Sequence, residues 1–199
     1  MDAQEVAAIV GETRRRAGRP VVVGVSGFGG SGKSTVARWL ESEVEGAVRM
    51  RGDDFLDPSR SHRRSSDWDG VERERLARDV LVPFRERRDS TFRRYDWALR
   101  ALGEPEPVPR GDVMIVDLIG LFHPATAPAL DLRIWCDVDL ATATTRGRAR
   151  DAEIGRDHEQ LWQEIWVPNE RDFVERFDPR SMADVRFTGS VPGVPKTGA

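Results

Sequence analysis

The sequence lacks the features that would place it in a membrane or in an oxidising compartment. Its single cysteine, Cys136, cannot form a disulfide within the chain, which is typical of proteins from a reducing cytoplasm. The longest apolar stretch, residues 113–122, is too short to cross a bilayer and is interrupted by Asp117. Asp2 and Glu5 stand where a signal peptide would have a basic and then an apolar segment. We therefore expect a cytoplasmic protein that does not associate with membranes.

An excess of basic charge is also missing. The formal net charge of the 199 residues is −3, so no overall positive field favours binding to nucleic acid. With 39% hydrophobic and 33% charged residues, the chain has the composition of a globular protein. Its length predicts one domain over residues 1–199, with a flexible tail at residues 190–199. We expect a small molecule as its partner, and the sequence leaves open whether the domain forms a homo-oligomer.

Lysine is nearly absent from the chain. Of the 31 basic residues, only Lys33 and Lys196 are lysines, and every other one is an arginine. Lys196 lies in the expected tail, so Lys33 is the single exception among the positions expected to be ordered. A compact ammonium and a planar guanidinium bind phosphate differently. The exception therefore indicates that Lys33 has a function that arginine cannot take over.

Short apolar runs alternate with helical patterns along the chain. The expected strands cover residues 20–25, 47–51, 113–117, 132–137 and 184–188, and the expected helices cover residues 2–16, 34–45, 71–87, 140–150 and 158–177. Residues 92–97 fit a strand or part of a hairpin, whereas residues 59–70 and 104–111 are expected to be loops. Such alternation predicts an α/β fold with a parallel sheet that is covered on both faces.

A glycine-rich motif follows the first expected strand and precedes a helix. The segment Gly27-Phe-Gly-Gly-Ser-Gly-Lys-Ser-Thr35 matches the P-loop pattern in full. In this context, backbone N–H groups surround the phosphates, the lysine reaches the β- and γ-phosphates, and the serine hydroxyl binds Mg²⁺. The motif therefore predicts nucleoside triphosphate binding rather than a glycine-rich turn that binds nothing. The expected nucleotide-binding residues are Gly27, Gly29, Gly30, Ser31, Gly32, Lys33, Ser34 and Thr35.

Two other classes of P-loop protein fit the sequence less well than a kinase. A GTPase switch would need an Asn-Lys-x-Asp guanine reader, but the only asparagine, Asn169, is followed by Glu170. A motor ATPase typically carries a second acid after the third strand, where this chain has Asp117 followed by Leu118. Kinases instead need an acid near the acceptor hydroxyl and cations around the transferred phosphoryl group.

Candidates for these kinase groups stand at the ends of expected strands and in one joint between helices. Asp53 and Asp54 follow the second strand, although Asp54 equally fits a residue that caps a turn. Asp117 ends the third strand. The joint between two helices is rich in arginine and suits a mobile lid, with some of its arginines exposed to solvent. These arginines are Arg146, Arg148, Arg150 and Arg156.

Taken in order, these segments resemble the uridine kinase and phosphoribulokinase-like group of P-loop kinases. The resemblance runs from residue 21 to about residue 189. Besides the P-loop, it is carried by Asp53-Asp-Phe55, Asp67-Trp-Asp-Gly70, Tyr95-Asp-Trp97, Gly111-Asp-Val-Met-Ile-Val-Asp117, residues 150–157 and Ala183-Asp-Val185. It implies the three-layer P-loop NTPase fold of nucleoside kinases, with a five-stranded parallel sheet in the order 2-3-1-4-5 and a helical lid at about residues 146–160.

The resemblance also implies a role for each matching residue. Asp53 would accept the proton of the acceptor hydroxyl, while Lys33, Arg150 and Arg156 would stabilise the transferred phosphoryl group. The implied acceptor-binding residues are Trp68, Asp69 and Tyr95, and the implied metal ligands are Ser34, Asp53 and Asp117. The implied reaction is transfer of the γ-phosphoryl group of ATP, with Mg²⁺, to a hydroxyl of a small metabolite.

Departures from the family pattern concern the metal and the acceptor. Asp117-Leu118 stands where the family has Glu-Gly, which leaves direct metal contact by Asp117 open. A base-reading histidine has no counterpart in residues 97–100, and Glu164-Ile165 replaces a Gln-Tyr pair. A nucleoside is the leading acceptor, and a vitamin precursor or a sugar is the alternative. A nucleotide-sensing protein without kinase activity stays open, as does ATP or GTP as donor.

Overall fold

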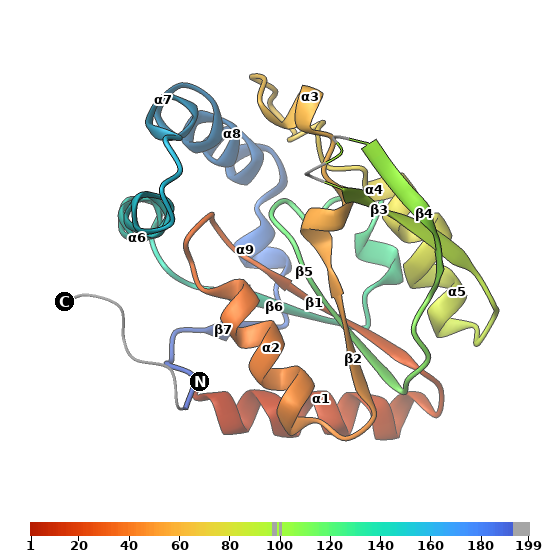
Figure 1. The fold of residues 1–199 in the computed structure, drawn as a ribbon. Coiled ribbons are helices and arrows are strands. Elements are labelled where there is room, and N and C mark those ends of the chain that lie inside the picture. The colour runs from red at the N-terminus through yellow and green to blue at the C-terminus, as the bar shows by residue number, and fades with distance from the viewer. Residues whose placement is uncertain (97–98, 100, 193–199) are drawn as a thin grey trace.

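The computed structural model describes residues 1–96, 99 and 101–192, and its centre is a five-stranded sheet (Figure 1). The sheet strands are β1 (Val21–Ser26), β2 (Ala47–Arg51), β5 (Val113–Asp117), β6 (Leu132–Cys136) and β7 (Val185–Phe187). They lie in the order β2-β5-β1-β6-β7, and every pair is parallel. Counted among themselves along the chain, the strands follow 2-3-1-4-5, so the predicted fold class and order are confirmed.

Burial on both faces explains why the two central strands are continuous apolar runs. Every residue of β1 and of β5 is buried. Val25 of β1 pairs with Asp117 of β5, which in turn pairs with Arg51 of β2. The carboxyl ends of three neighbouring strands therefore meet at one edge, and the P-loop and residues 52–54 leave the sheet there.

Two helices cover one face of the sheet. They are α1 (Ala3–Ala17) and α2 (Lys33–Glu43). Asp2 begins α1 in a capping box with Glu5, because each side chain accepts from the other residue's backbone N–H at 2.8 Å. The buried side of α2, with Leu40 fully enclosed, packs in one cluster with Val10 of α1 and Ile115 of β5. This packing fixes α2, and with it the P-loop that opens it.

Short helical segments cover the opposite face. They are η1 (Gly52–Phe55), α4 (Arg73–Leu76), η2 (Ala77–Leu81), α5 (Val82–Arg85), η3 (Ala127–Ala129) and α9 (Pro179–Met182). A further short helix, α3 (Pro58–Ser61), lies between η1 and α4 along the chain. The α4, η2 and α5 segments form the predicted helix at 71–87, broken by a stretch of π-helix that precedes Pro83. The short helix α3 corrects the prediction that residues 59–70 are entirely loop. Phe55, Leu81 and Phe122 belong to the core on this side.

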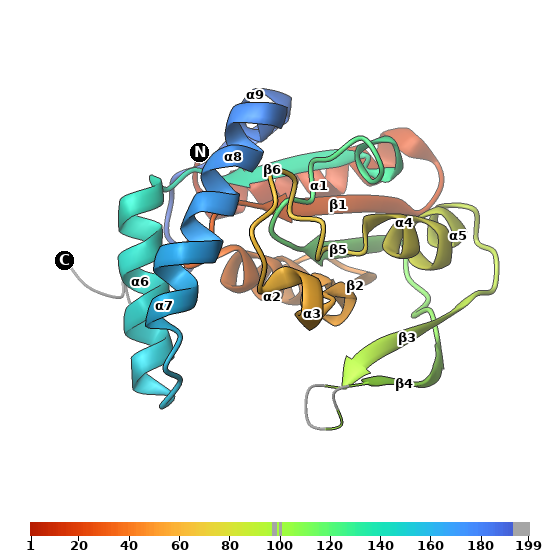
Figure 2. The same cartoon turned by 90° about the horizontal axis from the view of Figure 1, so that it is seen from above.

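A separate two-stranded hairpin projects beside the sheet (Figure 2). It pairs β3 (Thr91–Asp96) with β4 (Ala101–Pro107) in antiparallel fashion. The prediction that 104–111 is loop is therefore wrong for its first half. Proline has no N–H to donate, but β4 has only one neighbour, so Pro105 and Pro107 can occupy this strand. Residues 97, 98 and 100, on which the family comparison at 97–100 also depended, lie outside the described residues.

The helices that follow β6 stand together on the other side of the P-loop (Figures 1 and 2). They are α6 (Leu140–Glu153), α7 (Glu159–Leu161), η4 (Trp162–Trp166) and α8 (Val167–Phe177). The segment predicted as a lid corresponds to the second half of α6, the following turn and the start of α7. The tail predicted from residue 190 begins too early, because Val191 is buried against the core that α1 and α2 share. Among the described residues, no helix combines the length and apolarity that crossing a membrane requires.

The contrast between buried and exposed leucines tests this core. Leu40→Ala removes a fully buried side chain beneath the P-loop helix, and we expect the free energy of unfolding to fall by about 2–5 kcal/mol in urea denaturation. Leu102→Ala on the hairpin is the control, because 45% of that side chain is exposed, and we expect a change below about 0.5 kcal/mol. Equal losses in the two variants would contradict the core described here.

Candidate functional site

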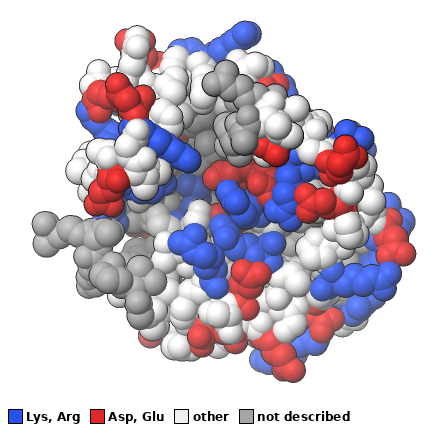
Figure 3. Space-filling view, viewed as in Figure 1, with Lys and Arg blue, Asp and Glu red and all other residues white. Residues whose placement is uncertain are grey.

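A large cavity opens at the carboxyl edge of the sheet, between the P-loop and lid helices on one side and residues 51–68 on the other. Its volume is about 850 Å³, which is within the range of small-molecule sites. Ligands of open α/β sheets bind outside the carboxyl ends of the strands, at the point where the strand order reverses. The lining includes Gly29, Gly30, Lys33, Ser34, Arg51, Asp53, Leu56, His62, Trp68, Tyr95, Asp117, Ile119, Arg150, Arg156, His158, Trp162, Trp166 and Glu170. Figure 3 shows basic side chains gathered near the middle of the same face.

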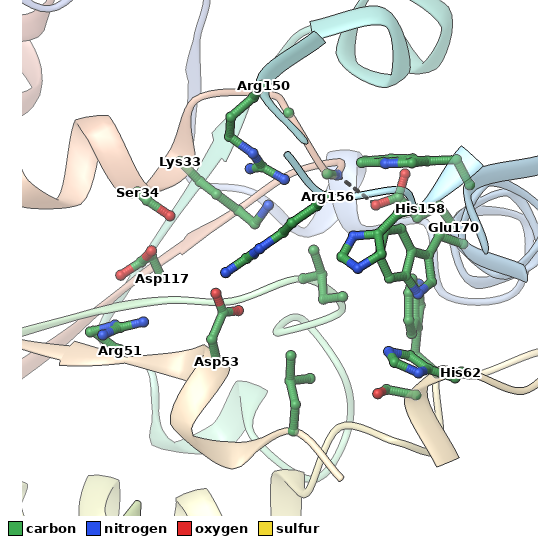
Figure 4. A pocket seen from close by; sticks show the side chains of 18 of the residues that line it. Lys33, Ser34, Arg51, Asp53, His62, Asp117, Arg150, Arg156, His158 and Glu170 are labelled. Atoms are coloured by element: carbon green, nitrogen blue, oxygen red, sulfur yellow. Dashed lines mark hydrogen bonds between the residues drawn. The ribbon is translucent and has the colours of Figure 1, made fainter. Parts of the chain in front are cut away.

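The P-loop ends in the backbone geometry that begins a helix. Gly32 has a left-handed conformation with φ of 89°, and its carbonyl accepts from the N–H groups of Thr35 and Val36. Lys33 and Ser34 then point into the cavity from the first turn of α2 (Figure 4). The Lys33 ammonium donates to the carbonyl of Phe28 at 3.0 Å, so it is folded back onto the loop. Thr35 follows on α2 but is not part of the cavity wall.

The lid helices pack directly on the glycines of the loop. A Cβ on Gly30 would lie 2.0 Å from the carbonyl oxygen of Ala143 in α6, and one on Gly29 would lie 2.8 Å from the ring of Trp162. A Cβ on Gly27 would lie 3.1 Å from the carbonyl oxygen of Cys136 at the end of β6. The hydroxyl of Ser31 is buried and has no hydrogen-bond partner in the described part of the chain. Glycine is required at position 30 because the loop backbone meets the backbone of α6 there, in addition to any contact with phosphate.

Asp53 and Asp117, the two predicted metal-side acids, have different surroundings. Asp117 is bound by Arg49 of β2 through two hydrogen bonds, Nε to Oδ1 at 2.8 Å and Nη2 to Oδ2 at 3.0 Å. Asp53 faces the cavity opposite Lys33 (Figure 4). Although Asp53 is open to the cavity, the surrounding protein displaces water from its carboxylate and raises its pKa, and Lys33 opposes this shift. Asp53 is therefore the acid available at this edge, whereas both oxygens of Asp117 are engaged.

The lid arginines divide into two groups. Arg150 and Arg156 line the cavity, whereas Arg146 is exposed and Arg148 is paired with Glu159. Arg150 donates to the buried Asp151, which also accepts from the indole N–H of Trp162 at 3.0 Å. Asp151 thus fixes the joint between α6 and η4. The structure therefore brings together the two arginines that were predicted to contact phosphate.

Two of the three predicted acceptor-binding residues reach the cavity. Trp68 is buried in its wall and has a left-handed backbone with φ of 55°, which is uncommon for a bulky residue. Tyr95 lines the cavity from the end of β3. Asp69 is exposed and is not part of the wall, so the structure does not place it at the site. Asp54, the alternative turn cap, is instead buried in an ion pair of 2.7 Å with Arg94 of the hairpin.

Aromatic rings from the end of the predicted lid and from η4 complete the wall, and the sequence reasoning missed them. His158 and Trp166 meet edge to face with centroids 5.2 Å apart, and Trp162 meets Trp166 at 5.0 Å. His62 packs at 6.0 Å from Trp166 from the opposite side, and burial lowers the pKa of its imidazole. Their spacing follows the apolar stripe of a helix, which on sequence alone is read as core. One half of the cavity is therefore ionic, and the other half is largely aromatic.

Glu170 is the second group that sequence reasoning missed. It lies on α8 with 4% of its surface exposed, and its Oε1 accepts from the backbone N–H of Gly29 at 2.5 Å. Burial raises the pKa of this carboxyl to about 7, against the opposing effects of the Gly29 hydrogen bond and Lys33. The signal that could have found it is an acid at a position shared with the apolar stripe of the helix, between Trp166 and Phe173.

The comparisons with known proteins agree with this geometry at the level of fold. No protein-family model matches the chain, and no curated protein sequence matches it. Among solved structures, a possible uridine kinase from Bacillus stearothermophilus is 16% identical with a TM-score of 0.67, covering 92% of this chain and 99% of its own. A candidate fructose transport system kinase from Silicibacter sp. is 20% identical with a TM-score of 0.72, covering 94% and 99%. The chain therefore has the fold of P-loop kinases, as the resemblance predicted.

The raised pKa of Glu170 predicts a specific dependence of stability on pH. A carboxyl that binds its proton more tightly in the folded state loses stabilisation as pH rises from about 4.5 to about 7. Glu170→Gln cannot ionise and keeps an oxygen for the Gly29 N–H. We expect it to be more stable than the parent protein above pH 7, by on the order of 2–3 kcal/mol, and similar to it near pH 4.5.

Urea denaturation at several pH values measures this difference. Glu175→Gln on the exposed side of the same helix is the matched control, and we expect its stability to follow the parent protein. A stability difference between Glu170→Gln and the parent that does not change with pH would contradict the raised pKa.

Proposed function

We propose that this protein is a kinase that transfers the γ-phosphoryl group of ATP, with Mg²⁺, to a hydroxyl group of a small metabolite. One observation carries the proposal: Lys33 and Ser34 of the P-loop face Asp53 across a single cavity, with Arg150 and Arg156 on the lid side (Figure 4). A nucleotide-binding loop, an acid on the acceptor side and mobile cations are the parts that in-line phosphoryl transfer needs. The fold shared with P-loop kinases supports the same assignment.

The oxygen donors at the sheet edge fit Mg²⁺ better than a transition metal. The Ser34 hydroxyl and the Asp53 carboxylate are hard ligands, and Mg²⁺ typically takes one or two protein oxygens and completes its shell with phosphate and water. Among the described residues, no cluster of three or more histidine, cysteine or acidic side chains could hold a metal. When bound, the ion would neutralise charge on the phosphates. Arg49 donates hydrogen bonds to both carboxylate oxygens of Asp117. We therefore propose that Asp117 acts on the metal through a water molecule and its ion pair with Arg49, rather than as a direct metal ligand.

The three cations and Asp53 then have separate tasks. Lys33, released from the carbonyl of Phe28, would contact the β- and γ-phosphates, and Arg150 and Arg156 would stabilise the charge that spreads over the transferred group. Asp53 would orient the acceptor hydroxyl and accept its proton. Its raised pKa brings a carboxylate closer to the basicity that this step requires.

The aromatic half of the cavity supports an acceptor with a flat ring. Tyr95, His62 and Trp166 line this half and are not fully buried, so a base could stack on them, and this favours a nucleoside as the acceptor. Asp69, which the resemblance assigned to sugar hydroxyls, lies outside the wall, so the proposal does not rely on it. The name of the Silicibacter structure keeps a sugar as the alternative acceptor.

A panel of acceptors tests the reaction and names the substrate class. We expect ADP release from ATP and Mg²⁺ to be stimulated by nucleosides more than by sugars or vitamin precursors. Asp53→Asn keeps the shape of the side chain but removes the base, so the stimulated rate should fall by about 10²–10⁴-fold. Asp89→Asn is the control, because 85% of that side chain is exposed. Tight ATP binding without stimulation by any acceptor would instead favour a nucleotide-sensing protein.

The scarcity of lysine allows a second test at the P-loop. Lys33→Arg retains the positive charge, but the planar guanidinium cannot follow the path of the ammonium between the loop and the phosphates. We expect a loss of at least about 10²-fold in ADP release, measured with the best acceptor of the panel. Arg38→Lys, on the exposed side of the same helix, should leave the rate unchanged. Full activity of Lys33→Arg would contradict the assigned role of this lysine.

A further inference from the structure

Glu170 occupies a donor of the phosphate-binding loop. The N–H of Gly29 belongs to the nucleotide-binding motif, yet in this structure it donates to Oε1 of Glu170 at 2.5 Å (Figure 4). The second oxygen, Oε2, is buried and has no hydrogen-bond partner within the residues that the structure describes. A buried carboxylate oxygen without a donor is costly, and most such groups in proteins are paired. The arrangement therefore suggests a ligand group or a proton that completes it.

The groups around Glu170 offer little compensation for a negative charge. Lys33, from the start of α2, is the charged side chain whose field reaches this carboxyl, and its ammonium donates to Phe28 instead. From η4, Trp162 contributes only its ring, which lies beside Gly29. The preceding residue on α8 is Asn169, whose side-chain oxygen accepts from the backbone N–H of Ser65 and not from a group near Glu170. No arginine or histidine forms an ion pair with Glu170 among the described residues.

A nucleotide bound at the P-loop would bring a second anion to this place. Two negative groups that share one donor in a water-poor site repel strongly, and one of them must move or take a proton. Glu170 has little room to move, because its side chain is enclosed with 4% of its surface exposed, and α8 continues from η4, whose Trp162 packs on the P-loop and donates to Asp151. Protonation is the change that leaves the lid helices in place.

We propose that Glu170 works as a neutral carboxylic acid when a nucleotide is bound, so that one proton is taken up with the phosphates and the lid helices stay seated on the P-loop. This inference rests on the proposed function, since it requires a phosphate-bearing ligand at the loop. The proton comes from solvent and resides on Oε2, the oxygen that has no hydrogen-bond partner within the described residues. No covalent bond is formed or broken in this step.

The surroundings of Glu170 already hold its proton more tightly than an exposed carboxyl does. Burial raises its pKa to about 7 before any ligand arrives, and a neighbouring phosphate would raise it further. Below pH 7 the acid is neutral and nucleotide binding needs no proton. Above pH 7 the acid is ionised, and nucleotide binding must first protonate it. Nucleotide affinity should therefore fall by up to about tenfold for each pH unit above 7.

Calorimetry with the full chain measures both the affinity and the proton. The probe is the non-hydrolysed ATP analogue with an imido group between its β- and γ-phosphates, with MgCl₂, at pH 6 and pH 8. Each titration is repeated in two buffers of different ionisation enthalpy, so that the number of protons taken up is obtained directly. Glu170→Gln mimics the neutral acid, and Glu175→Gln on the same helix is the matched control.

We expect the parent protein and Glu175→Gln to behave alike, and to take up close to one more proton than Glu170→Gln at pH 8. Glu170→Gln should bind about as tightly as the parent at pH 6 and roughly tenfold more tightly at pH 8. The protons of the nucleotide itself cancel in this comparison.

Two results would overturn the inference, and they are distinguishable. Binding with the same proton uptake in the parent and in Glu170→Gln, or an equal loss of affinity for Glu170→Gln at both pH values, would show that Glu170 is only structural, while nucleotide binding itself would stand. Absence of binding in the parent protein at either pH would overturn the proposed function as well.

Discussion

The site depends on one constraint, the burial of β1 and β5 on both faces of the sheet. Polar groups cannot emerge along these strands, because every residue of both is enclosed. They emerge only where the strands end, and the parallel register places those ends at one edge. The P-loop, Asp53 and Asp117 come from three different parts of the chain and meet there for this reason.

The contact of the lid helices with the P-loop is the second constraint, and it follows from the first. α6 leaves β6, the neighbour of β1, so it starts beside the loop that leaves β1. Its carbonyl at Ala143 approaches Gly30 so closely that a side chain cannot fit between them. The loop of glycines thus meets a helix backbone on one side and, under the proposed function, would meet phosphates on the other. A displacement of α6 would consequently also displace the P-loop residues that would hold the nucleotide.

The sequence predicted the central sheet and the P-loop well because both follow from local patterns. β-branched runs, a glycine motif and a lone lysine are visible without any tertiary information. The β4 strand was missed because its prolines argue against a strand unless the strand has a single neighbour. The tail prediction placed Val191 outside the core because no local sequence pattern indicates that this residue packs in one cluster with α1.

The candidate site was harder to predict, since partners distant in sequence decide the state of each acid. The residues next to Asp117 in sequence do not indicate that Arg49 donates to both of its carboxylate oxygens. The residues next to Glu170 likewise do not indicate that it accepts from the N–H of Gly29. Asp69 was assigned from resemblance alone, and the fold leaves it exposed and outside the cavity wall. Local patterns therefore identified the residues whose side chains could bind a metal or a ligand, and the tertiary fold determined which of them lie at the cavity.

The pairing of acids and arginines shows what that selection achieved. Asp54, Asp117 and Asp151 are buried, and each has an arginine within hydrogen-bond distance, so their charges are already neutralised in the protein. Asp53 and Glu170 line the same cavity and have no such ion pair within the described residues, and the pKa of each is raised. Unpaired carboxyl groups with a raised pKa in a cleft are where catalytic and ligand-dependent protonation is expected. Arginine thus pairs with Asp54, Asp117 and Asp151, whereas Asp53 and Glu170, the two acids that we propose to respond to ligands, have no ion pair within the described residues.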